Sequence, residues 1–447
     1  MNQKIAILGY RSEGIAAYRY WKAKGADITI CDQLETPAAS LPEGVATQLG
    51  PDYLKDLDRF DVIVRSPGLN PSKILAVNPT VGPKITTIVN EFLAASPTRN
   101  LVGVTGTKGK GTTTTLIAKM LEATGKQVFV GGNIGTPVLD LLPQLTPDSW
   151  AVLELSSFQL YDVTNPTPHI AVCLMIAPEH LDWHGTMDDY LLGKSQLFAH
   201  QQAGDIAVYF AQNDYSKHIA AARPGTKIPY FAEPGAVVKD GSITIAGQTI
   251  CRTDELGLLG EHNWQNACAA VTAVWQVAPD AEAIRSVLVS FTGLEHRLEL
   301  VREVGGVKYY DDSFGTTPET AIVAIQAFAQ PKVVILGGSD KGANFTALAG
   351  VVQTANVREV VLIGNMANPQ HRSISPSIEA ELKAAGYTAI TSLVKPGGPT
   401  MAEAVAAARA AAQPGDVVLL STGCASFDMF KDYKDRAAQF QAAVSRL

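Results

Sequence analysis

A glycine-rich turn near residue 106 constrains this chain more than any other feature. Residues 101–104 read as a short apolar strand, residues 106–112 read Gly-Thr-Lys-Gly-Lys-Gly-Thr, and a helix-compatible segment follows. Such a strand, turn and helix bring backbone N–H groups and one lysine around the phosphates of a nucleotide. Glycine lets the backbone approach the phosphates, and Lys110 supplies a charge for the terminal ones. We therefore expect an ATP-binding turn.

A second interpretation of the turn stays open at this point. A Gly-Lys pair is common between any strand and helix, and Gly111 stands where a hydroxyl side chain usually follows the lysine to hold Mg²⁺. Thr112 and Thr113 still offer hydroxyls one residue further on. The turn alone leaves a phosphate loop and an ordinary structural turn as alternatives.

Length and composition indicate a soluble protein of several domains. At about 150 residues per domain, 447 residues suggest roughly three. The chain is 46% hydrophobic and 18% charged, no apolar run is long enough for a membrane helix, and the first residues read as a strand rather than a signal peptide. We expect a cytoplasmic protein with no membrane partner.

Charge and cysteine content exclude several classes of protein. The net charge is −7, and no run of lysine and arginine is interleaved with aromatic residues, so a nucleic-acid partner is not expected. The cysteines are scattered without paired spacing, which indicates neither a zinc site nor a disulfide framework. They are Cys31, Cys173, Cys251, Cys268 and Cys424. Small molecules are the expected partners.

The chain opens with the pattern of a nucleotide-binding βαβ unit. Residues 4–9 predict a strand, residues 12–25 an amphipathic helix, and residues 27–31 a second strand that ends at Asp32, where a ribose is often held. The glycine fingerprint is degenerate because Arg11 stands at its middle glycine. A further strand at residues 60–65 ends in a Ser-Pro-Gly turn that suits either a ligand or a purely structural role.

Two more α/β units follow an aperiodic segment at residues 94–100. The middle unit predicts strands at residues 101–104, 127–130, 150–155, 169–175 and 205–210, a hairpin turning at Asp240-Gly241, and a helix at residues 263–277. The last unit predicts strands at residues 307–310, 332–336, 359–363, 388–394 and 416–420, with helices that include residues 318–328 and 401–412. Three consecutive α/β units are the simplest account.

Two polar segments of the middle unit are candidates for metal chemistry. Glu154 ends an apolar strand, where a P-loop domain places an acidic residue for Mg²⁺, although a plain strand-end turn is the alternative. Residues 179–185 hold two histidines and two carboxylates, which suits a metal-binding or charge-handling cluster with His180 as a ligand. A solvated acidic turn with a stacking histidine has the same pattern.

Motifs in one order along the whole chain resemble the Mur ligases. They include the turn at 106–110, Gly-Gly-Asn-Ile-Gly at 131–135, Glu-Leu-Ser-Ser-Phe-Gln at 154–159, His-Leu-Asp-Trp-His-Gly at 180–185 and Tyr-Leu-Leu-Gly-Lys at 190–194. They continue with Gly-Glu-His-Asn at 260–263, Glu-His-Arg at 295–297, Asp-Asp-Ser at 311–313, Leu-Gly-Gly-Ser-Asp-Lys at 336–341 and Cys-Ala-Ser-Phe-Asp-Met-Phe at 424–430.

The resemblance implies a fold and an activity. The expected fold is α/β in three domains: a Rossmann-like UDP-sugar-binding domain over residues 1–96, a central P-loop ATPase domain over 97–293, and a Rossmann-like glutamate-binding domain over 294–447. The expected activity is ATP-dependent addition of D-glutamate to UDP-N-acetylmuramoyl-L-alanine through an acyl phosphate, in cytoplasmic synthesis of peptidoglycan precursors. Expected cofactors are two Mg²⁺ ions and a carbamylated lysine, and the expected state is a monomer.

The resemblance also assigns candidate residues to each ligand. ATP would contact Gly106, Thr107, Lys108, Gly109, Lys110, Gly111, Thr112, Asn266, His296, Arg297 and Asp312. The UDP-sugar would contact Ser12, Glu13, Asp32, Gln33, Ser66, Pro67, Gly68 and Asn133, and glutamate would contact Thr316, Lys341, Ser426 and Tyr433. Thr112, Glu154, His180 and Lys194 would serve the metal ions, and Lys110, His180, Lys194 and Lys341 would be catalytic.

Several positions depart from the family's usual pattern. Lys108 stands where asparagine is common, Glu179 lies in a segment that is usually Thr-x-Asp, and Phe314 replaces a lysine. Without the resemblance, Lys194 would read as an ordinary solvated helix lysine. A Mur-type ligase for L-glutamate or another amino acid, and a non-catalytic nucleotide-binding homologue, are the alternative functions.

Overall fold

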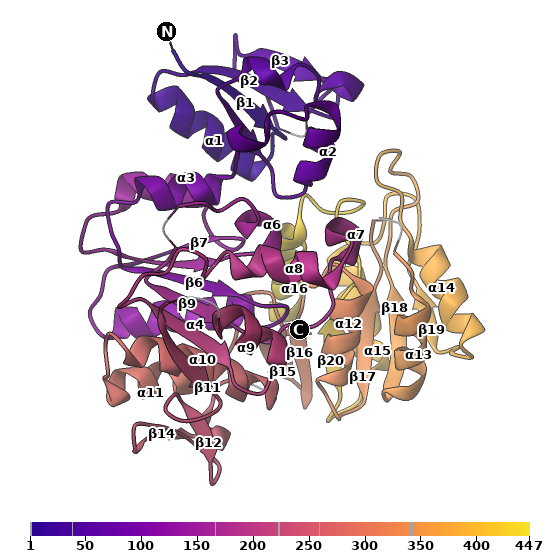
Figure 1. Cartoon of the computed structure of the whole chain (residues 1–447). Coiled ribbons are helices and arrows are strands. Elements are labelled where there is room, and N and C mark those ends of the chain that lie inside the picture. The colour runs from indigo at the N-terminus through magenta and orange to yellow at the C-terminus, as the bar shows by residue number, and fades with distance from the viewer. Residues whose placement is uncertain (1, 38, 166, 222–223, 259, 340–342) are drawn as a thin grey trace. The chain divides into compact units, whose positions relative to one another are not determined.

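The computed structural model describes residues 2–37, 39–165, 167–221, 224–258, 260–339 and 343–447. The chain divides into two compact units, residues 1–291 and residues 292–447 (Figure 1). Each is described by itself.

The first sheet of the larger unit is entirely parallel and has the order β3-β2-β1-β4-β5. Its strands are β1 (Lys4–Leu8), β2 (Asp27–Asp32), β3 (Ala46–Leu49), β4 (Val62–Arg65) and β5 (Ile85–Thr86), and its helices are α1 (Ser12–Ala23), α2 (Pro71–Val77) and α3 (Ile88–Ala95). Because β1 has β2 on one side and β4 on the other, the strand order reverses beside it. Open α/β sheets bind ligands beyond the carboxyl ends of the strands at such a point.

The second sheet is also parallel, with the order β11-β10-β9-β6-β8-β7. Its strands are β6 (Leu101–Thr105), β7 (Val128–Gly132), β8 (Trp150–Glu154), β9 (Ile170–Cys173), β10 (Ile206–Phe210) and β11 (Thr226–Tyr230). The accompanying helices are α4 (Lys110–Ala123), α5 (Val138–Leu141), α6 (Ser157–Leu160), α7 (Leu181–His184), α8 (Met187–Ser195), α9 (Asp214–Ala221), α10 (His262–Trp275) and α11 (Ala281–Ser290). The continuous apolar runs of β6 and β8 are buried throughout, as strands covered on both faces require.

A small antiparallel sheet confirms the predicted hairpin. It consists of β12 (Val237–Lys239), β13 (Ser242–Ile245) and β14 (Gln248–Arg252). Asp240 and Gly241 both have positive φ, 48° and 71°, as a type I′ turn requires of its two central residues.

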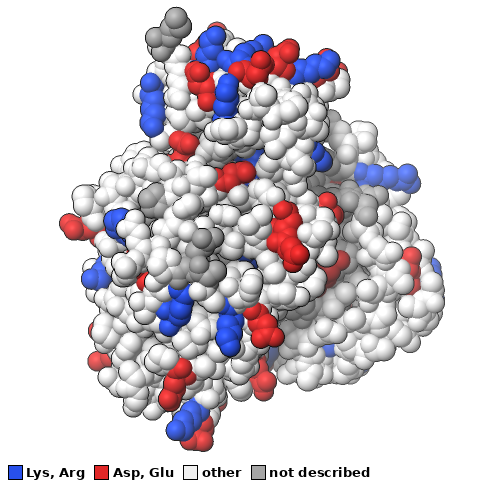
Figure 2. All heavy atoms as spheres, in the orientation of Figure 1, with Lys and Arg blue, Asp and Glu red and all other residues white. Residues whose placement is uncertain are grey.

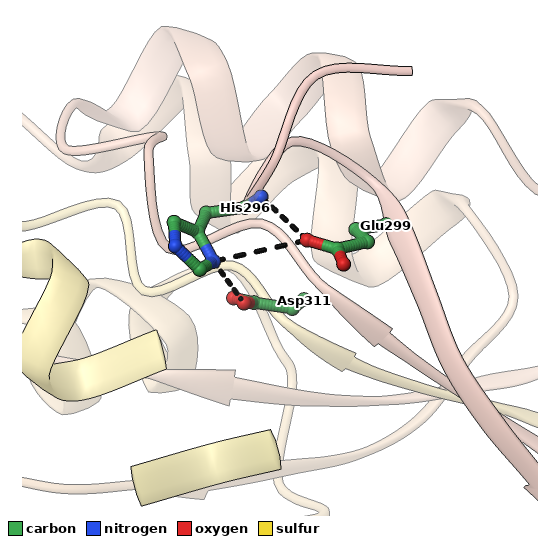
Figure 3. Close-up of side chains that lie close together, drawn as sticks. All are labelled: His296, Glu299 and Asp311. Atoms are coloured by element: carbon green, nitrogen blue, oxygen red, sulfur yellow. Dashed lines mark hydrogen bonds and ion pairs between the residues drawn. The ribbon is translucent and has the colours of Figure 1, made fainter. Parts of the chain in front are cut away.

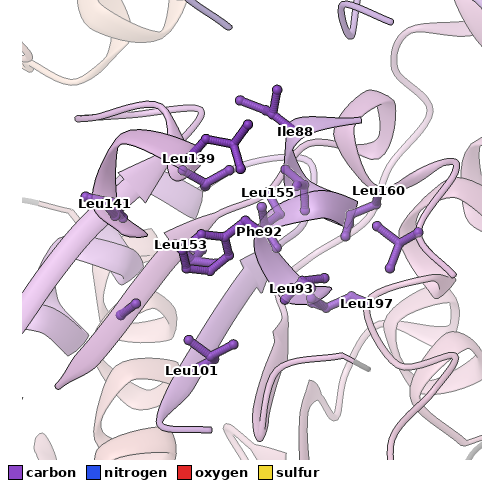
Figure 4. Close-up of a cluster of buried hydrophobic side chains, with 14 of the residues drawn as sticks. Ile88, Phe92, Leu93, Leu101, Leu139, Leu141, Leu153, Leu155, Leu160 and Leu197 are labelled. Atoms are coloured by element: carbon purple, nitrogen blue, oxygen red, sulfur yellow. The ribbon is translucent and has the colours of Figure 1, made fainter. Parts of the chain in front are cut away.

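A shared apolar core joins the first two sheets into one unit. Ile88, Phe92 and Leu93 of α3 pack with Leu139 and Leu141 of α5 and with residues from the second sheet (Figure 4). Burying one large aliphatic or aromatic side chain contributes about 1.5–3 kcal/mol, so the core couples these elements strongly. The boundary expected near residue 96 therefore falls inside a compact unit, and the division at residue 96 stays a proposal.

The second unit is built on one mixed sheet with the order β15-β16-β20-β17-β18-β19. Its strands are β15 (Glu299–Val304), β16 (Val307–Asp311), β17 (Lys332–Leu336), β18 (Val357–Leu362), β19 (Ile390–Ser392) and β20 (Val417–Leu420), and β15 alone runs antiparallel among these strands. Its helices are α12 (Pro318–Gln326), α13 (Thr346–Thr354), α14 (Ser375–Ala384), α15 (Met401–Ala411) and α16 (Tyr433–Ser445). The predicted α/β fold is confirmed, with three large sheets that follow one another along the chain.

The distribution of surface charge and the length and polarity of the helices complete the description of the fold. Acidic and basic side chains are interspersed on the face shown in Figure 2, without a broad patch of one sign among the described residues in view. Across the described part of the chain, each helix is too short or too polar to span a bilayer.

Candidate functional site: a phosphate loop and its neighbours

The glycine-rich turn links β6 to the N-terminus of α4. Gly106 and Gly109 have positive φ, 149° and 85°. A Cβ on Gly106 would lie 2.6 Å from the Leu174 Cβ, and one on Gly109 would lie 2.2 Å from the Asn266 Oδ1. Glycine is therefore required at both positions by backbone conformation and by space. The N-terminus of α4, where the positive end of the helix dipole lies, is a ready anion site.

Two lysines converge on one carbonyl of this turn. Lys110 Nζ donates to the carbonyl oxygens of Gly106 and Thr107 at 3.1 and 3.0 Å, and Lys194 Nζ donates to that of Gly106 at 2.8 Å. Lys194 comes from α8 and is 1% exposed. Burial, followed by the charge of Lys110, lowers the pKa of Lys194 to about 7. Lys194 is thus a buried amine of α8 that contacts the turn, and not the solvated surface lysine of the alternative interpretation.

Hydrogen bonds to the neighbouring strand segment hold the turn in place. Thr107 N donates to the Met175 carbonyl at 2.8 Å, and Thr107 Oγ1 lies 3.0 Å from the Tyr190 hydroxyl. The Lys194 ammonium lies 4.6 Å from the centre of the Tyr190 ring. Tyr190 therefore contacts both the turn and the buried lysine.

Glu154 ends β8 and is 4% exposed. Asn133 follows β7 and donates its side-chain amide to Glu154 Oε1 at 2.7 Å. A Cβ on Gly132 would lie 2.2 Å from the Glu154 carbonyl oxygen, so the glycine permits this close approach of the two strands. The structure thus pairs the expected metal carboxylate with a residue expected near the sugar.

His180 lies in a loop that contacts the turn through charged residues. Glu179 Oε1 is 2.8 Å from Lys108 Nζ, and Glu179 Oε2 is 3.6 Å from His180 Nε2. Burial alone would raise the pKa of Glu179, but Lys108, by its hydrogen bond and charge, and then His180 lower it below the ordinary value. Burial lowers the pKa of His180, against the opposing charge of Glu179. The Phe158 ring packs 4.8 Å from the His180 ring.

The second histidine of the cluster, His184, is held on both sides of its ring. Its side chain is fully buried, Nδ1 donates to Asp189 Oδ2 at 3.0 Å, and Nε2 accepts from Ser157 Oγ at 2.9 Å. With both nitrogens engaged, His184 is a packing residue behind His180.

The polar side chains around the turn fit a nucleoside triphosphate with Mg²⁺. Mg²⁺ takes one or two carboxylates, keeps several waters and is completed by substrate phosphates. Glu154, His180 and Thr112 offer a carboxylate, an imidazole and a hydroxyl around the turn, and Thr112 in the first turn of α4 is 9% exposed. Gly111 occupies that same helical turn and offers no side-chain ligand.

The residues expected to bind the UDP-sugar gather at the reversal point of the first sheet. Ser12 and Glu13 begin α1, and Asp32 ends β2 and accepts from the backbone N–H groups of Tyr10 and Leu34 at 2.8 and 3.0 Å. Ser66 follows β4, and its Oγ would lie 2.8 Å from a Cβ on Gly9. The remaining candidates of this edge are Gln33, Pro67 and Gly68.

Gln159 makes a contact with Glu13 that the sequence analysis did not predict. Its side chain donates to Glu13 Oε1 at 2.7 Å, which links α6 of the second sheet to α1 of the first. Its own Oε1 accepts from the Ser156 backbone N–H at 3.0 Å, closing a capping box on α6. The Ser-x-x-Gln spacing is a known signal for such a box, but it predicts a helix start and not a partner in another sheet.

In the second unit, aromatic stacking replaces the lysine that the family pattern predicts. The Arg297 guanidinium lies 4.9 Å from the Phe314 ring centre, and the Tyr433 ring meets Phe314 edge-on at 5.5 Å. Asp312 is buried and accepts from Ser421 Oγ at 2.7 Å. Burial raises the pKa of Asp312 to about 6.

His296 belongs to a cluster with two carboxylates. Its Nδ1 donates to Asp311 Oδ2 at 2.9 Å, and its backbone N–H donates to Glu299 Oε2 at 2.7 Å (Figure 3). Among the residues that the structure describes, this is the group of three metal-capable side chains whose ligand atoms lie within 4.8 Å of one another. Asp311 Oδ2 and Glu299 Oε2 already accept hydrogen bonds from His296, and the bond to Nδ1 orients the imidazole ring.

The expected glutamate contacts are placed only in part. Tyr433 begins α16, Ser426 is 2% exposed in the loop after β20, and Thr316 precedes α12. Lys341 lies outside the described residues.

Comparison with known proteins agrees with this arrangement. Residues 104–274 match the Mur ligase middle domain, and residues 296–424 match the Mur ligase glutamate ligase domain. A UDP-N-acetylmuramoylalanine–D-glutamate ligase from Symbiobacterium thermophilum is 36% identical over 100% of this chain and 99% of its own. This chain belongs to the Mur ligase family. A relative of the same name from Pelotomaculum thermopropionicum is also 36% identical, over 100% of this chain and 98% of its own.

Solved structures of other Mur ligases share the fold. A MurC ligase from Thermotoga maritima superposes with a TM-score of 0.58 at 16% identity, over 100% of both chains. A MurF ligase from Acinetobacter baumannii gives a TM-score of 0.60 at 18% identity, over 100% of this chain and 94% of the other. The predicted family and three-part α/β fold of this Mur ligase are confirmed.

Proposed function

We propose that this Mur ligase joins D-glutamate to UDP-N-acetylmuramoyl-L-alanine at the expense of ATP. The observation that carries the proposal is the convergence of Lys110 and Lys194 on the Gly106 carbonyl at a glycine-built anion site. The name carried by the full-length relatives supports the choice of substrates.

The chemistry needs an activated acid. An oxygen of the alanyl carboxylate attacks the γ-phosphorus of ATP, the bond to the β,γ-bridging oxygen breaks, and ADP leaves. The amine of glutamate then attacks the acyl carbon, the tetrahedral intermediate expels phosphate, and the amine loses a proton as the amide forms. Every species on this path is anionic, so cations preorganised around the turn stabilise the developing charge. Lys110 is the residue suited to the β- and γ-phosphates.

Metal ions would be held beside this lysine. We assign Glu154 and Thr112 to one Mg²⁺ and His180 to a second, and Lys194 would supply an anionic oxygen ligand beside them if its amine is modified. When bound, the metal supplies charge neutralisation and Lewis-acid polarisation of phosphoryl oxygens.

Lys194 would meet this need as a carbamate. Its neutral amine adds to carbon dioxide and loses a proton, which replaces a repelling ammonium with a carboxylate-like group. The support for this assignment is the position of Lys194, buried against the turn and 2.8 Å from the Gly106 carbonyl.

The remaining ligand contacts follow the proposed division of the chain into residues 1–96, 97–293 and 294–447. The first part takes the UDP-sugar, to which Asn133 of the second part also contributes. The second part takes ATP, with Asn266 among its contacts. The third part contributes His296, Arg297 and Asp312 to the nucleotide and Thr316, Lys341, Ser426 and Tyr433 to glutamate. A planar guanidinium such as Arg297 pairs with phosphate oxygens at two points. We further propose that the protein is a monomer and acts in the cytoplasm. Size-exclusion chromatography with light scattering tests the oligomeric state.

One assay tests the reaction. Purified protein is incubated with ATP, Mg²⁺, UDP-N-acetylmuramoyl-L-alanine and a panel of D- and L-amino acids, and phosphate release and product mass are followed. We expect release that depends on D-glutamate. A preference for L-glutamate or another amino acid contradicts only the acceptor assignment. If no amino acid produces phosphate release above the background, the ligase is contradicted and a non-catalytic homologue is favoured.

A further inference from the structure

Arg65 is a buried cation that ties the first sheet to the second. It ends β4, immediately before the Ser66-Pro67-Gly68 turn, and its side chain is fully buried. Its Nε donates to the Asp162 carboxylate, and one terminal nitrogen donates to the Phe158 carbonyl at 2.7 Å. Both partners lie in the segment that contains α6 and follows β8. A planar guanidinium that donates to two different acceptors fixes their relative positions better than a single point charge does.

The other terminal nitrogen of Arg65 faces the turn itself. It lies 3.3, 3.4 and 3.3 Å from the carbonyl oxygens of Ser66, Pro67 and Leu69. One guanidinium therefore contacts the turn on one side and the second sheet on the other. The peptide dipoles of the turn point their negative ends at this charge, which fixes the direction of its carbonyl groups.

Trp183 of α7 makes a second connection to the same turn. Its indole N–H donates to the Gly68 carbonyl at 3.2 Å, and its own carbonyl accepts from the Asn70 side chain at 2.7 Å. The Arg65 guanidinium lies 5.7 Å from the centre of the Trp183 ring, within the range of a cation–π contact. We call Arg65, Asn70, Asp162 and Trp183 the clasp.

The clasp continues toward the candidate metal ligand. The centre of the Phe158 ring lies 5.0 Å from the centre of the Trp183 ring and 4.8 Å from the centre of the His180 ring. Phe158 also supplies the carbonyl that Arg65 binds. The turn expected to hold the UDP-sugar and the loop that carries His180 are thus connected by contacting side chains within one unit.

We propose that Arg65 is a positioning residue for the UDP-sugar, holding the Ser66–Gly68 turn at a fixed place relative to the phosphate loop. The proposal deepens the proposed function and rests on it, because it takes the substrate assignment of this turn as given. The ligand class is a nucleoside-diphosphate sugar that ends in a carboxylate. The first sheet would hold its nucleotide end, while its carboxylate must reach the phosphate loop of the second sheet. A shift of the Ser66–Gly68 turn relative to the phosphate loop would therefore misplace the carboxylate.

A purely structural role for Arg65 makes a different prediction. Loss of a structural contact lowers stability and affects both substrates alike, whereas loss of a positioning contact raises the KM and Kd for the UDP-substrate and leaves the KM for ATP in place. Arg19 and Asp140 provide a matched control, because this ion pair also joins the two sheets, through α1 and α5, without contacting the turn.

The experiment compares Arg65→Met, Arg65→Lys, Trp183→Phe and the control Arg19→Met with the wild type. Calorimetry gives the Kd for UDP-N-acetylmuramoyl-L-alanine without ATP, and steady-state kinetics gives both KM values. We expect Arg65→Met to raise the Kd and KM for the UDP-substrate about tenfold or more and the KM for ATP by less than about twofold. Arg65→Lys keeps the charge but loses the planar guanidinium, so we expect its Kd and KM for the UDP-substrate to lie between those of the wild type and Arg65→Met. We expect Arg19→Met to change none of these values.

Trp183→Phe keeps an aromatic ring, although a smaller one, and removes the indole N–H donor, so it tests the clasp even if Arg65→Met does not fold. We expect it to raise the Kd for the UDP-substrate about two- to fivefold. Unchanged binding by folded Arg65→Met, or by Trp183→Phe where that variant alone folds, overturns the proposal, as does an equal effect of Arg19→Met. A wild type that binds no UDP-substrate overturns the proposed function instead.

Discussion

Lys108 Nζ lies 2.8 Å from Glu179 Oε1, and the resemblance to the Mur ligases predicts a different residue at each of these two positions. Lys108 belongs to the phosphate loop and Glu179 to the loop of His180, so the two departures contact each other across the site. Because the second Glu179 oxygen faces His180 at 3.6 Å, the pair holds the candidate metal ligand against the turn. A lysine in this loop is thereby neutralised and adds no net charge beside Lys110.

We expect the effects of Lys108→Ala and Glu179→Ala to be non-additive. Each should lower kcat/KM for ATP severalfold, and the double variant should resemble the worse single one. Since the Lys108 side chain is 62% exposed, solvent screening limits the coupling energy to about 0.3–1 kcal/mol. A double-mutant cycle on kcat/KM measures it, and strictly additive effects would show that the pair has no role.

Replacing Lys110 should abolish turnover. Lys110→Ala removes the cation assigned to the terminal phosphates, and loss of one such charge-stabilising group costs about 10²–10³ in kcat. Lys119→Ala is the matched control, because Lys119 is an exposed lysine of the same helix. Phosphate release measures both variants, and near-normal activity of Lys110→Ala would remove the phosphate-loop assignment.

Lys194 should respond to carbon dioxide. We expect bicarbonate to raise wild-type activity and small carboxylates to restore Lys194→Ala in part, because a carboxylate can occupy the place of the carbamate. ¹³C NMR with labelled bicarbonate detects the modified amine directly. Lys110→Ala, which removes the other lysine on the Gly106 carbonyl, should not respond to added carboxylates. Indifference of Lys194→Ala to every treatment would leave Lys194 as a packing residue.

Asp312 should make the protein less stable as the pH rises. Burial raises its folded-state pKa to about 6, above an unfolded value of about 4, so between these values the folded state binds more protons. The free energy of unfolding therefore falls with increasing pH across this window, by at most about 3 kcal/mol for a shift of two units. Asp312→Asn removes the titration while other groups stay the same. We expect the variant to gain stability relative to wild type between pH 4 and 7 in calorimetry, and a constant difference would contradict the assignment.

Local sequence patterns predicted the elements whose side chains are buried on both faces. The apolar runs of β6, β8, β17 and β20 were found because burial demands them. Residues 46–49 of β3 are exposed or half-buried, and β5 has two residues, so neither leaves a periodic signal. The edge strand β15, with its charged Glu-Leu-Val-Arg-Glu-Val sequence, was missed because its pairing with β16 decides its conformation.

The site was predictable where its residues share one turn and unpredictable where they meet from distant segments. Gly106, Lys110 and Glu154 could be proposed from their position at strand ends. The contact of Gln159 with Glu13 spans 146 positions and that of Arg65 with Asp162 spans 97. Such pairs depend on how two sheets pack, which no local pattern of residue types records.

The close fit of Gly109 against Asn266 means that a late part of the chain completes the packing of the phosphate loop. The loop and helix α4 are complete by residue 123, but the amide that fills the space beside Gly109 belongs to α10, which begins at His262. A nascent chain that stops short of α10 carries every phosphate-binding residue of the loop without this support. The packing around the loop is thus completed only after more than half of the polypeptide has been synthesised.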